Sequence, residues 1–147
     1  MTTPFVLHPR LAEDCLTIGH FELCRLLLMN DSHYPWFILV PQIPALREIY
    51  QLSKIQRDQL GDESCYLAEH LAVSFQADKI NIATIGNLVP QLHIHHVVRY
   101  QNDIAWPKPV WGFTSATHYT LEQLQDLQSR LRTMLPLCQF NDRSQHL

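Results

Sequence analysis

The spacing of apolar residues changes along the chain from the short runs of strands to the wider repeat of helices. Runs that are bounded by turn-forming residues, typical of β-strands, occupy residues 16–18, 21–29, 36–40, 79–85 and 91–99. The first of these strands is expected to end at Gly19. The second and third predict a hairpin around a loop at residues 30–35. The second run lacks alternation, which predicts that both of its faces are covered.

Two segments have the spacing of helices. The first, at about residues 53–76, begins with Ser53 and Gln56, which can form a capping box. Its apolar stripe is expected to face the sheet and consists of Leu60, Leu67, Leu71 and Phe75. Its polar face carries Arg57, Asp58, Asp62, Glu63 and Glu69. The second helix, at about residues 120–135, begins at a capping box of Thr120 and Gln123. Together these elements predict an α+β fold with an antiparallel sheet of about five strands.

The composition is that of one globular domain spanning residues 1–147, because 46% of the residues are hydrophobic and only 17% are charged. The net charge is −3 and no basic run occurs, so we expect no nucleic-acid partner. The apolar runs are much shorter than the ~20 residues of a membrane helix, so we expect no membrane partner. The four glycines are too widely spaced for a dinucleotide fingerprint or a P-loop.

The four cysteines, at positions 15, 24, 65 and 138, form no Cys-x-x-Cys pair. Neither a zinc knuckle nor a dithiol redox motif is therefore predicted. No basic segment leads into an apolar run at the start of the sequence, so we expect no secretory signal. These observations favour reduced thiols and a cytoplasmic location.

Three histidines lie within four positions of the last predicted strand. Because side chains alternate along a strand, one face receives Gln91, His93, His95, Val97 and Arg99. The other face is expected to meet the core and carries Leu92, Ile94, His96 and Val98, with His96 as a hydrogen-bonded, half-buried imidazole. The first face gathers an amide, two imidazoles and a guanidinium, which are costly to bury unless each has a partner.

Two chemistries suit two imidazoles at this spacing. In the first, a neutral histidine attacks phosphorus while a carbonyl fixes its other ring N–H, and neighbouring groups donate hydrogen bonds to the phosphate oxygens. In the second, both histidines ligate a metal together with a third ligand from elsewhere. The His-x-His pattern alone does not distinguish these two possibilities.

The wider segment, Gly86-Asn87-Leu88-Val89-Pro90-Gln91-Leu92-His93-Ile94-His95-His96-Val97-Val98-Arg99, resembles the signature of the histidine triad (HIT) family. That signature is His-φ-His-φ-His-φ-φ, where φ is apolar, often after a glycine-containing loop and before a basic residue. The hairpin, the long helix and Trp106-Pro107 also fall where the family has such features, so the resemblance covers about residues 10–115. The ungapped register places Gln91, His93 and His95 at the triad positions. Using His96 as the third member would require an insertion that turns every later side chain to the other face.

The resemblance implies a HIT-like fold and a hydrolase of nucleotide conjugates, such as dinucleoside polyphosphates or nucleoside phosphoramidates, with no cofactor and no obligatory metal. It implies that His93 attacks the α-phosphorus and forms a nucleotidyl-histidine that water hydrolyses. His95 would contact the phosphate and the leaving group. Gln91 could orient a neighbour or donate to phosphate, but it could not carry charge or shuttle a proton, so the rate is affected more than binding.

The resemblance also implies substrate contacts and a homodimer. Asn30 would contact the ribose, Gly86 and Asn87 would form the phosphate-side loop, and Trp106 would lie near the leaving group, the nucleobase or a dimer contact. The alternatives are ordinary turn residues at Asn30 and Asn87, a core lid at Trp106 and a solvated strand end at Arg99.

Two rival functions remain open at this point. One is a nucleotide-binding protein with little or no catalysis, which glutamine at position 91 supports. The other is a metal-dependent hydrolase or oxygenase that uses His93 and His95 as ligands.

Overall fold

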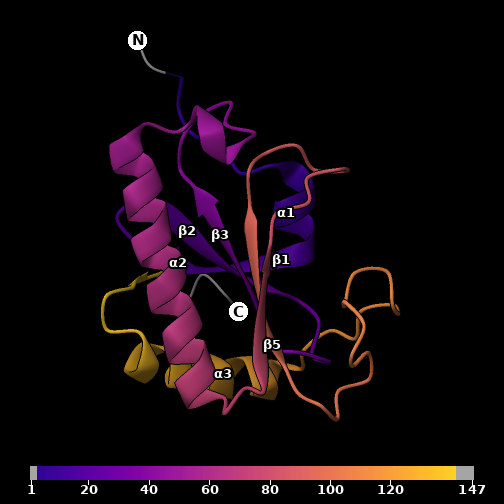
Figure 1. Ribbon diagram of the computed structural model, residues 1–147. Helices are drawn as coiled ribbons and strands as arrows, with labels where there is room; N and C mark the ends of the chain where they lie inside the picture. The colour runs from indigo at the N-terminus through magenta and orange to yellow at the C-terminus, as the bar shows by residue number, and fades with distance from the viewer. Residues whose placement is uncertain (1–2, 142–147) are drawn as a thin grey trace.

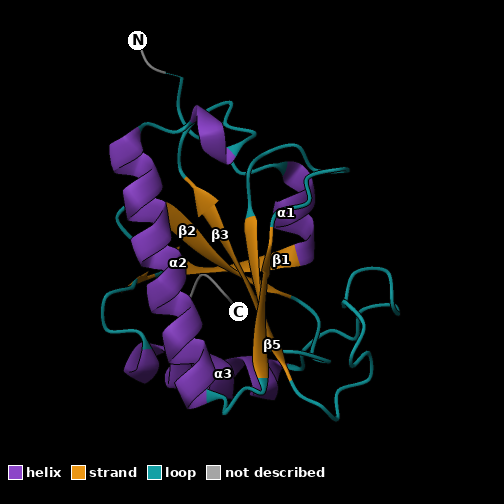
Figure 2. Ribbon diagram, viewed as in Figure 1, coloured by secondary structure: helices purple, strands orange, loops and turns teal. Residues whose placement is uncertain are grey.

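A six-stranded antiparallel sheet forms the centre of the computed structural model, which describes residues 3–141 (Figures 1 and 2). The strands lie in the order β4–β5–β3–β2–β1–β6. Their bounds are β1 (Cys15–His20), β2 (Cys24–Met29), β3 (Trp36–Pro41), β4 (Lys79–Ala83), β5 (Ile94–Arg99) and β6 (Gln139–Phe140). The helices are α1 (Pro9–Asp14), α2 (Lys54–Ser74) and α3 (Leu121–Met134), with a 3-10 turn η1 (Ile49–Gln51). The predicted α+β class and antiparallel sheet are confirmed, with six strands in place of about five.

Both predicted capping boxes open their helices. The Ser53 hydroxyl accepts from Gln56 N at 3.2 Å, and the Gln56 side chain accepts from Ser53 N at 2.9 Å. Thr120 and Gln123 exchange the same two bonds at the start of α3, at 3.2 and 2.8 Å. These reciprocal bonds satisfy backbone donors that a helix start leaves unpaired.

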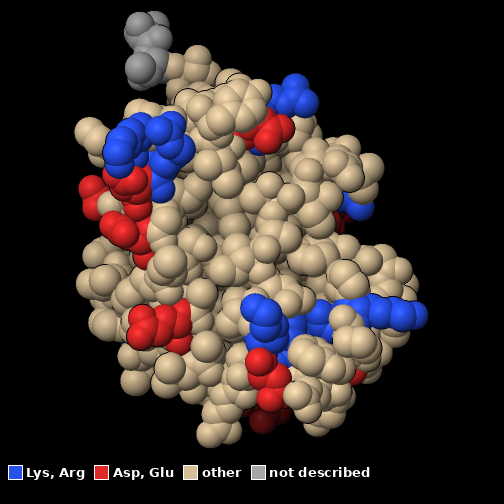
Figure 3. All heavy atoms as spheres, in the orientation of Figure 1, with Lys and Arg blue, Asp and Glu red and all other residues tan. Residues whose placement is uncertain are grey.

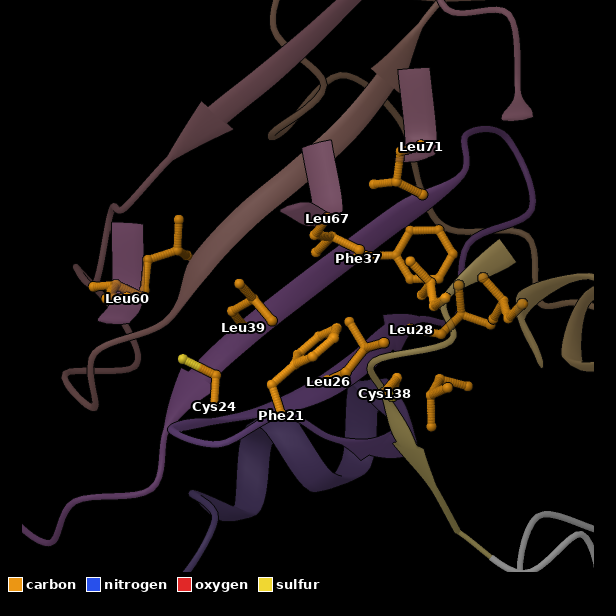
Figure 4. Packing of buried hydrophobic residues seen from close by; sticks show 14 of the residues in the cluster. Phe21, Cys24, Leu26, Leu28, Phe37, Leu39, Leu60, Leu67, Leu71 and Cys138 are labelled. Atoms are coloured by element: carbon orange, nitrogen blue, oxygen red, sulfur yellow. The ribbon is translucent and has the colours of Figure 1, made fainter. Parts of the chain in front are cut away.

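The main core lies between α2 and one face of the sheet (Figure 4). Leu67 and Leu71 of α2 are fully buried and point toward β3, where Phe37 and Leu39 meet them. Leu26 of β2 joins the same cluster. The predicted apolar stripe of the long helix is therefore the surface that packs on the sheet, as burial of such side chains favours.

A second, smaller cluster covers the opposite face of the sheet. Leu27, Ile38 and Val97 point to this side from β2, β3 and β5. Residues 5–11 and 105–111 pack over them. The sheet is thus covered on both faces, which explains the missing alternation in β2 and confirms the prediction made for that strand.

Gly19 does not end β1, contrary to the prediction. The strand continues to His20 and pairs with β6, a two-residue strand that the sequence pattern did not reveal. A Cβ at Gly19 would lie 2.2 Å from the Gln139 carbonyl oxygen. Glycine is therefore required here by the close approach of another backbone rather than by a turn.

Glu63 was expected on the polar face of α2 but is buried, with 5% of its surface exposed. Its carboxylate accepts from the backbone N–H groups of Leu23 and Cys24, both at 2.9 Å, and from the Gln59 side chain at 2.6 Å. These bonds fasten α2 to the turn between β1 and β2. Such a buried carboxylate is tolerated because each oxygen has a donor.

Replacing Glu63 with glutamine should destabilise the fold. Its amide nitrogen would face a backbone N–H and leave that donor unpaired, at a cost of about 1–3 kcal/mol. Glu69→Gln, an exposed position on the same helix, serves as the matched control and should change stability very little. The free energy of unfolding in urea measures both variants. Equal stability of the two variants would contradict the role given to Glu63.

Candidate active site

β5 presents its histidines to the two covered faces of the sheet, as the predicted alternation requires. His96 faces α2, where its Nε2 lies 2.7 Å from the Ser64 hydroxyl and its Nδ1 lies 3.0 Å from the Ile94 carbonyl oxygen. His96 is hydrogen-bonded, as expected, but it is fully buried and not half-buried. His93 and His95 lie on the opposite side. Strand pairing begins only at Ile94, so His93 directly precedes β5 instead of lying in a strand that starts at residue 91.

The ring of His93 is held by the backbone two residues before it. Its Nδ1 lies 2.7 Å from the backbone carbonyl oxygen of Gln91. A carbonyl can only accept, so Nδ1 carries the proton and a neutral His93 keeps a lone pair on Nε2. Burial lowers the pKa of His93 below its ordinary 6.5; the Gln91 carbonyl opposes this change, and charge on His8 adds to it. The site therefore favours a neutral ring with a free nitrogen.

His93 lines a small, open cleft. The cleft is bounded by the segment before η1, the end of the β4 region and the approach to β5, and its walls include Arg47, Glu48, Gly86 and Gln91. Gly86 has a φ of +70°, a conformation that glycine adopts easily. Asn87 follows it in an exposed turn. Of the predicted site residues, Gly86, Gln91 and His93 thus line one cleft.

His95 has the opposite tautomer. The indole Nε1–H of Trp36 donates to its Nδ1 at 3.0 Å, so a neutral His95 carries its proton on Nε2. Its ring packs between Trp36 and Trp111, with centroid distances of 5.7 and 5.2 Å. Burial, with the neighbouring charges of His93 and His96, lowers the pKa of His95 to about 3. His95 is therefore a neutral hydrogen-bond donor near pH 7.

The two rings lie side by side, with centroids 5.0 Å apart and planes at 71°. His93 offers an electron pair and His95 offers a proton from the neighbouring ring. A nucleophile beside a hydrogen-bond donor is the pairing that acyl and phosphoryl transfer require, because charge builds on the oxygens as the nucleophile attacks.

The Gln91 side chain is bound to the N-terminal segment. Its Oε1 accepts from His8 N at 2.8 Å, and its Nε2 donates to the Val6 carbonyl oxygen at 2.9 Å. The carboxamide thus joins the segment before α1 to the cleft.

Asn30 and Trp106 lie toward the other end of β5. Asn30 follows β2. By the strand register, it lies five residue positions from His93 along the strand direction, which corresponds to ~16 Å at ~3.3 Å per residue. Its side-chain oxygen accepts from Tyr119 N at 2.9 Å, ahead of α3. The Trp106 ring lies over the Arg99 guanidinium, 5.6 Å from its Cζ. These two residues are not in contact with the His93–His95 pair.

The interpretation of Arg99 as a solvated strand end is wrong, because only 1% of its surface is exposed. It donates to Asp103 through Nε at 2.8 Å and through a terminal nitrogen at 3.1 Å, and to Asn81 at 2.8 Å. Burial alone would raise the pKa of Asp103, but hydrogen bonds from Arg99 and from backbone N–H groups outweigh it and lower the pKa. This ion pair holds the segment that follows β5.

Sequence reasoning missed three residues of this region: Trp36, Trp111 and His8. Trp36 was seen only as part of an apolar strand, and its contact with His95 depends on the pairing of Ile38 with His95 across β3 and β5. Trp111 comes from an irregular proline-rich segment. His8 could have been suspected from Pro9, which is favoured at the first position of a helix, but α1 has only six residues.

Within residues 3–141, no group of three His, Cys, Asp or Glu side chains is placed to hold a metal ion. The Nδ1 atoms of His93 and His95 are both engaged by protein groups. A third ligand, which the metal hypothesis requires, is therefore missing from this part of the chain. No helix among the same residues is long and apolar enough to cross a membrane.

Comparison with known proteins agrees with this geometry. The family model described as HIT domain matches residues 10–102. A histidine triad protein from Marinobacter aquaeolei VT8 is 47% identical, covers 93% of this chain and 100% of its own, and has a TM-score of 0.90. No curated protein matches the chain significantly.

Two further solved structures are similar over most of the chain. A histidine triad protein from Bradyrhizobium japonicum is 40% identical over 90% of this chain and 99% of its own, with a TM-score of 0.88. A histidine triad protein from Sinorhizobium meliloti 1021 is 39% identical over 89% and 97%, with a TM-score of 0.87. The chain therefore belongs to the HIT domain family, whose members are generally nucleotide hydrolases or transferases.

Proposed function

We propose that this protein hydrolyses nucleotide conjugates, such as dinucleoside polyphosphates or nucleoside phosphoramidates, through a nucleotidyl-histidine on His93. The observation that carries the proposal is the 2.7 Å contact between His93 Nδ1 and the Gln91 carbonyl oxygen. It leaves Nε2 unprotonated on a residue that lines the cleft. A neutral imidazole with a fixed N–H on its far side is a competent nucleophile toward phosphorus.

In the first step, His93 Nε2 forms a bond to the α-phosphorus and the bond from phosphorus to the leaving group breaks. The imidazole becomes cationic because Nδ1 keeps its proton. The Gln91 carbonyl stabilises this cation through the same hydrogen bond. His95 Nε2–H donates to a phosphoryl oxygen as negative charge builds there.

In the second step, water attacks the same phosphorus and the phosphorus–nitrogen bond breaks. The products are a nucleoside monophosphate and neutral His93. Over both steps one water is consumed, and its two protons end on the leaving group and the monophosphate. Arg47, exposed at the cleft and in no ion pair within residues 3–141, supplies positive charge for the phosphates.

The finer assignments belong to the same proposal. Gln91 stands at the first triad position, Gly86 and Asn87 form the phosphate-side loop, and Asn30 and Trp106 contact the more distant parts of the substrate. We also propose that the protein forms a homodimer and is located in the cytoplasm. The four cysteines, all free, fit a reducing compartment.

A nucleotide-binding protein with very slow turnover is the second candidate. It is favoured by one observation: the Gln91 carboxamide is bound to Val6 and His8 and cannot transfer a proton. This candidate predicts nucleotide affinity without product after prolonged incubation. On the face shown, basic side chains form a short band at the lower right and separate groups at the top, with acidic side chains beside them (Figure 3).

Replacing His93 with alanine should lower turnover of adenylated substrates by at least about 10³-fold, because the attacking nitrogen is lost. Released nucleoside monophosphate measures the rate, and chemical denaturation checks that the variant is folded. His118→Asn, at an exposed loop position, is the control and should retain full activity. Turnover by folded His93→Ala at the rate of the control would contradict the nucleophile assignment, and loss of wild-type activity in chelator would favour a metal.

The pH profile should report a neutral nucleophile. Since burial lowers the pKa of His93, kcat/KM should be flat at neutral pH and fall only on the acid side, with a midpoint below 6.5. A dinucleoside polyphosphate whose bridging phosphates do not titrate in this range is the suitable substrate. Recovery of activity on return to pH 7 separates this titration from unfolding. An acid limb centred above 6.5 would show that the ring is not held in its neutral form.

Trp36→Phe should lower kcat about fivefold to tenfold, because His95 loses the donor that keeps its proton on Nε2. Trp111→Phe is the matched control: it removes a similar ring edge from His95, but the Trp111 Nε1 has no hydrogen-bond partner within residues 3–141. Steady-state kinetics should therefore show a larger loss for Trp36→Phe. Equal losses would mean that packing, and not the tautomer of His95, matters.

A further inference from the structure

The N-terminal segment carries an imidazole that neither the triad signature nor the strand pattern includes. His8 immediately precedes α1 and is only partly exposed. Its backbone N–H donates to the Gln91 carboxamide, whose side chain projects from the same face as His93. Gln91, which lines the cleft, therefore binds this segment at the backbone of His8 itself.

Two interactions from Gln91 fix the path of this segment. The amide accepts from His8 N at 2.8 Å and donates to Val6 O at 2.9 Å, so it binds the backbone on both sides of Leu7. Phe5 and Leu7 pack on the second hydrophobic cluster, which covers the sheet face that carries His93 and His95. Polar and apolar contacts together hold residues 5–8 over that face.

The ring of His8 is also fixed. Its Nδ1 accepts from Arg10 N at 3.1 Å and caps α1. Because Nδ1 acts as an acceptor, neutral His8 carries its proton on Nε2. No protein partner of this Nε2–H occurs among the described residues. His8 lies close enough to the nucleophile for its charge to lower the pKa of His93.

We propose that His8 is the third imidazole of the active site, and that its Nε2–H donates a hydrogen bond to a phosphate oxygen of the bound substrate. Gln91 is then a positioning residue, which places His8 through the backbone of residues 6–8. This inference rests on the proposed function and identifies a substrate contact within that site. This positioning role of Gln91 requires no proton transfer.

The direct test compares His8→Asn with His118→Asn. Asparagine keeps a side-chain acceptor for Arg10 N and is a favoured N-cap, so it preserves α1 while removing the imidazole. We expect His8→Asn to retain the stability of the wild type and to lose on the order of 10²-fold in kcat/KM, as expected for loss of one donor to a charged phosphate. His118→Asn should lose nothing. Equal activity of His8→Asn and His118→Asn would overturn the proposal.

A double-mutant cycle tests the role of Gln91. If Gln91 acts through His8, the double variant Gln91→Ala/His8→Asn should be no slower than the slower single variant, because one contact is lost in all three. Fully additive losses would show that Gln91 acts independently of His8. Unfolding measurements on each variant confirm that the comparison is made between folded proteins.

A binding measurement separates this inference from the proposed function. In NMR titrations of the wild type, AMP should shift the ring resonances of His8, while adenosine, which lacks phosphate, and the ring of His118 serve as controls. Absence of turnover by the wild type would refute the proposed hydrolase activity, but it would not affect the response of the His8 ring to AMP. A His8 ring that does not respond to AMP, in an active enzyme or an inactive one, would overturn the third-imidazole assignment.

Discussion

The protonation pattern of two buried imidazoles is the constraint on which the rest of this site depends. A neutral histidine has one donor and one acceptor nitrogen, and the protein decides which is which by the partner it offers. The Gln91 carbonyl requires a proton on His93 Nδ1, and the Trp36 indole requires a lone pair on His95 Nδ1. The two free nitrogens therefore have opposite character. Burial keeps both rings neutral, because it lowers both pKa values.

The fold makes this arrangement possible by covering both faces of its sheet. One face packs against α2, and the other is covered by residues 5–11 and 105–111. Both histidines are largely buried on this second face, which strengthens their hydrogen bonds to the Gln91 carbonyl and the Trp36 indole. The same cover brings Trp111 against His95 and joins the N-terminal segment to Gln91. Irregular segments thus complete a site that a regular sheet supports.

The sequence predicted what depends on local pattern and missed what depends on pairing between distant segments. Both capping boxes, the stripe of α2 and the alternation along β5 follow from residues close together in the chain. Gly19, Glu63 and Arg99 were misinterpreted because their surroundings come from β6, the β1–β2 turn and Asn81 of β4. Trp36 and His8 reach the site only through strand register and the Gln91 side chain. A resemblance at residues 86–99 indicated a candidate site, but it could not reveal these partners.

The central claim is tested most directly by the tautomers of the free protein at neutral pH. Long-range ¹⁵N–¹H NMR correlations of the imidazole rings distinguish a protonated from an unprotonated ring nitrogen. The account predicts that His93 is protonated on Nδ1 alone and His95 on Nε2 alone. A proton on Nε2 of His93, or a doubly protonated ring at either position, would contradict it.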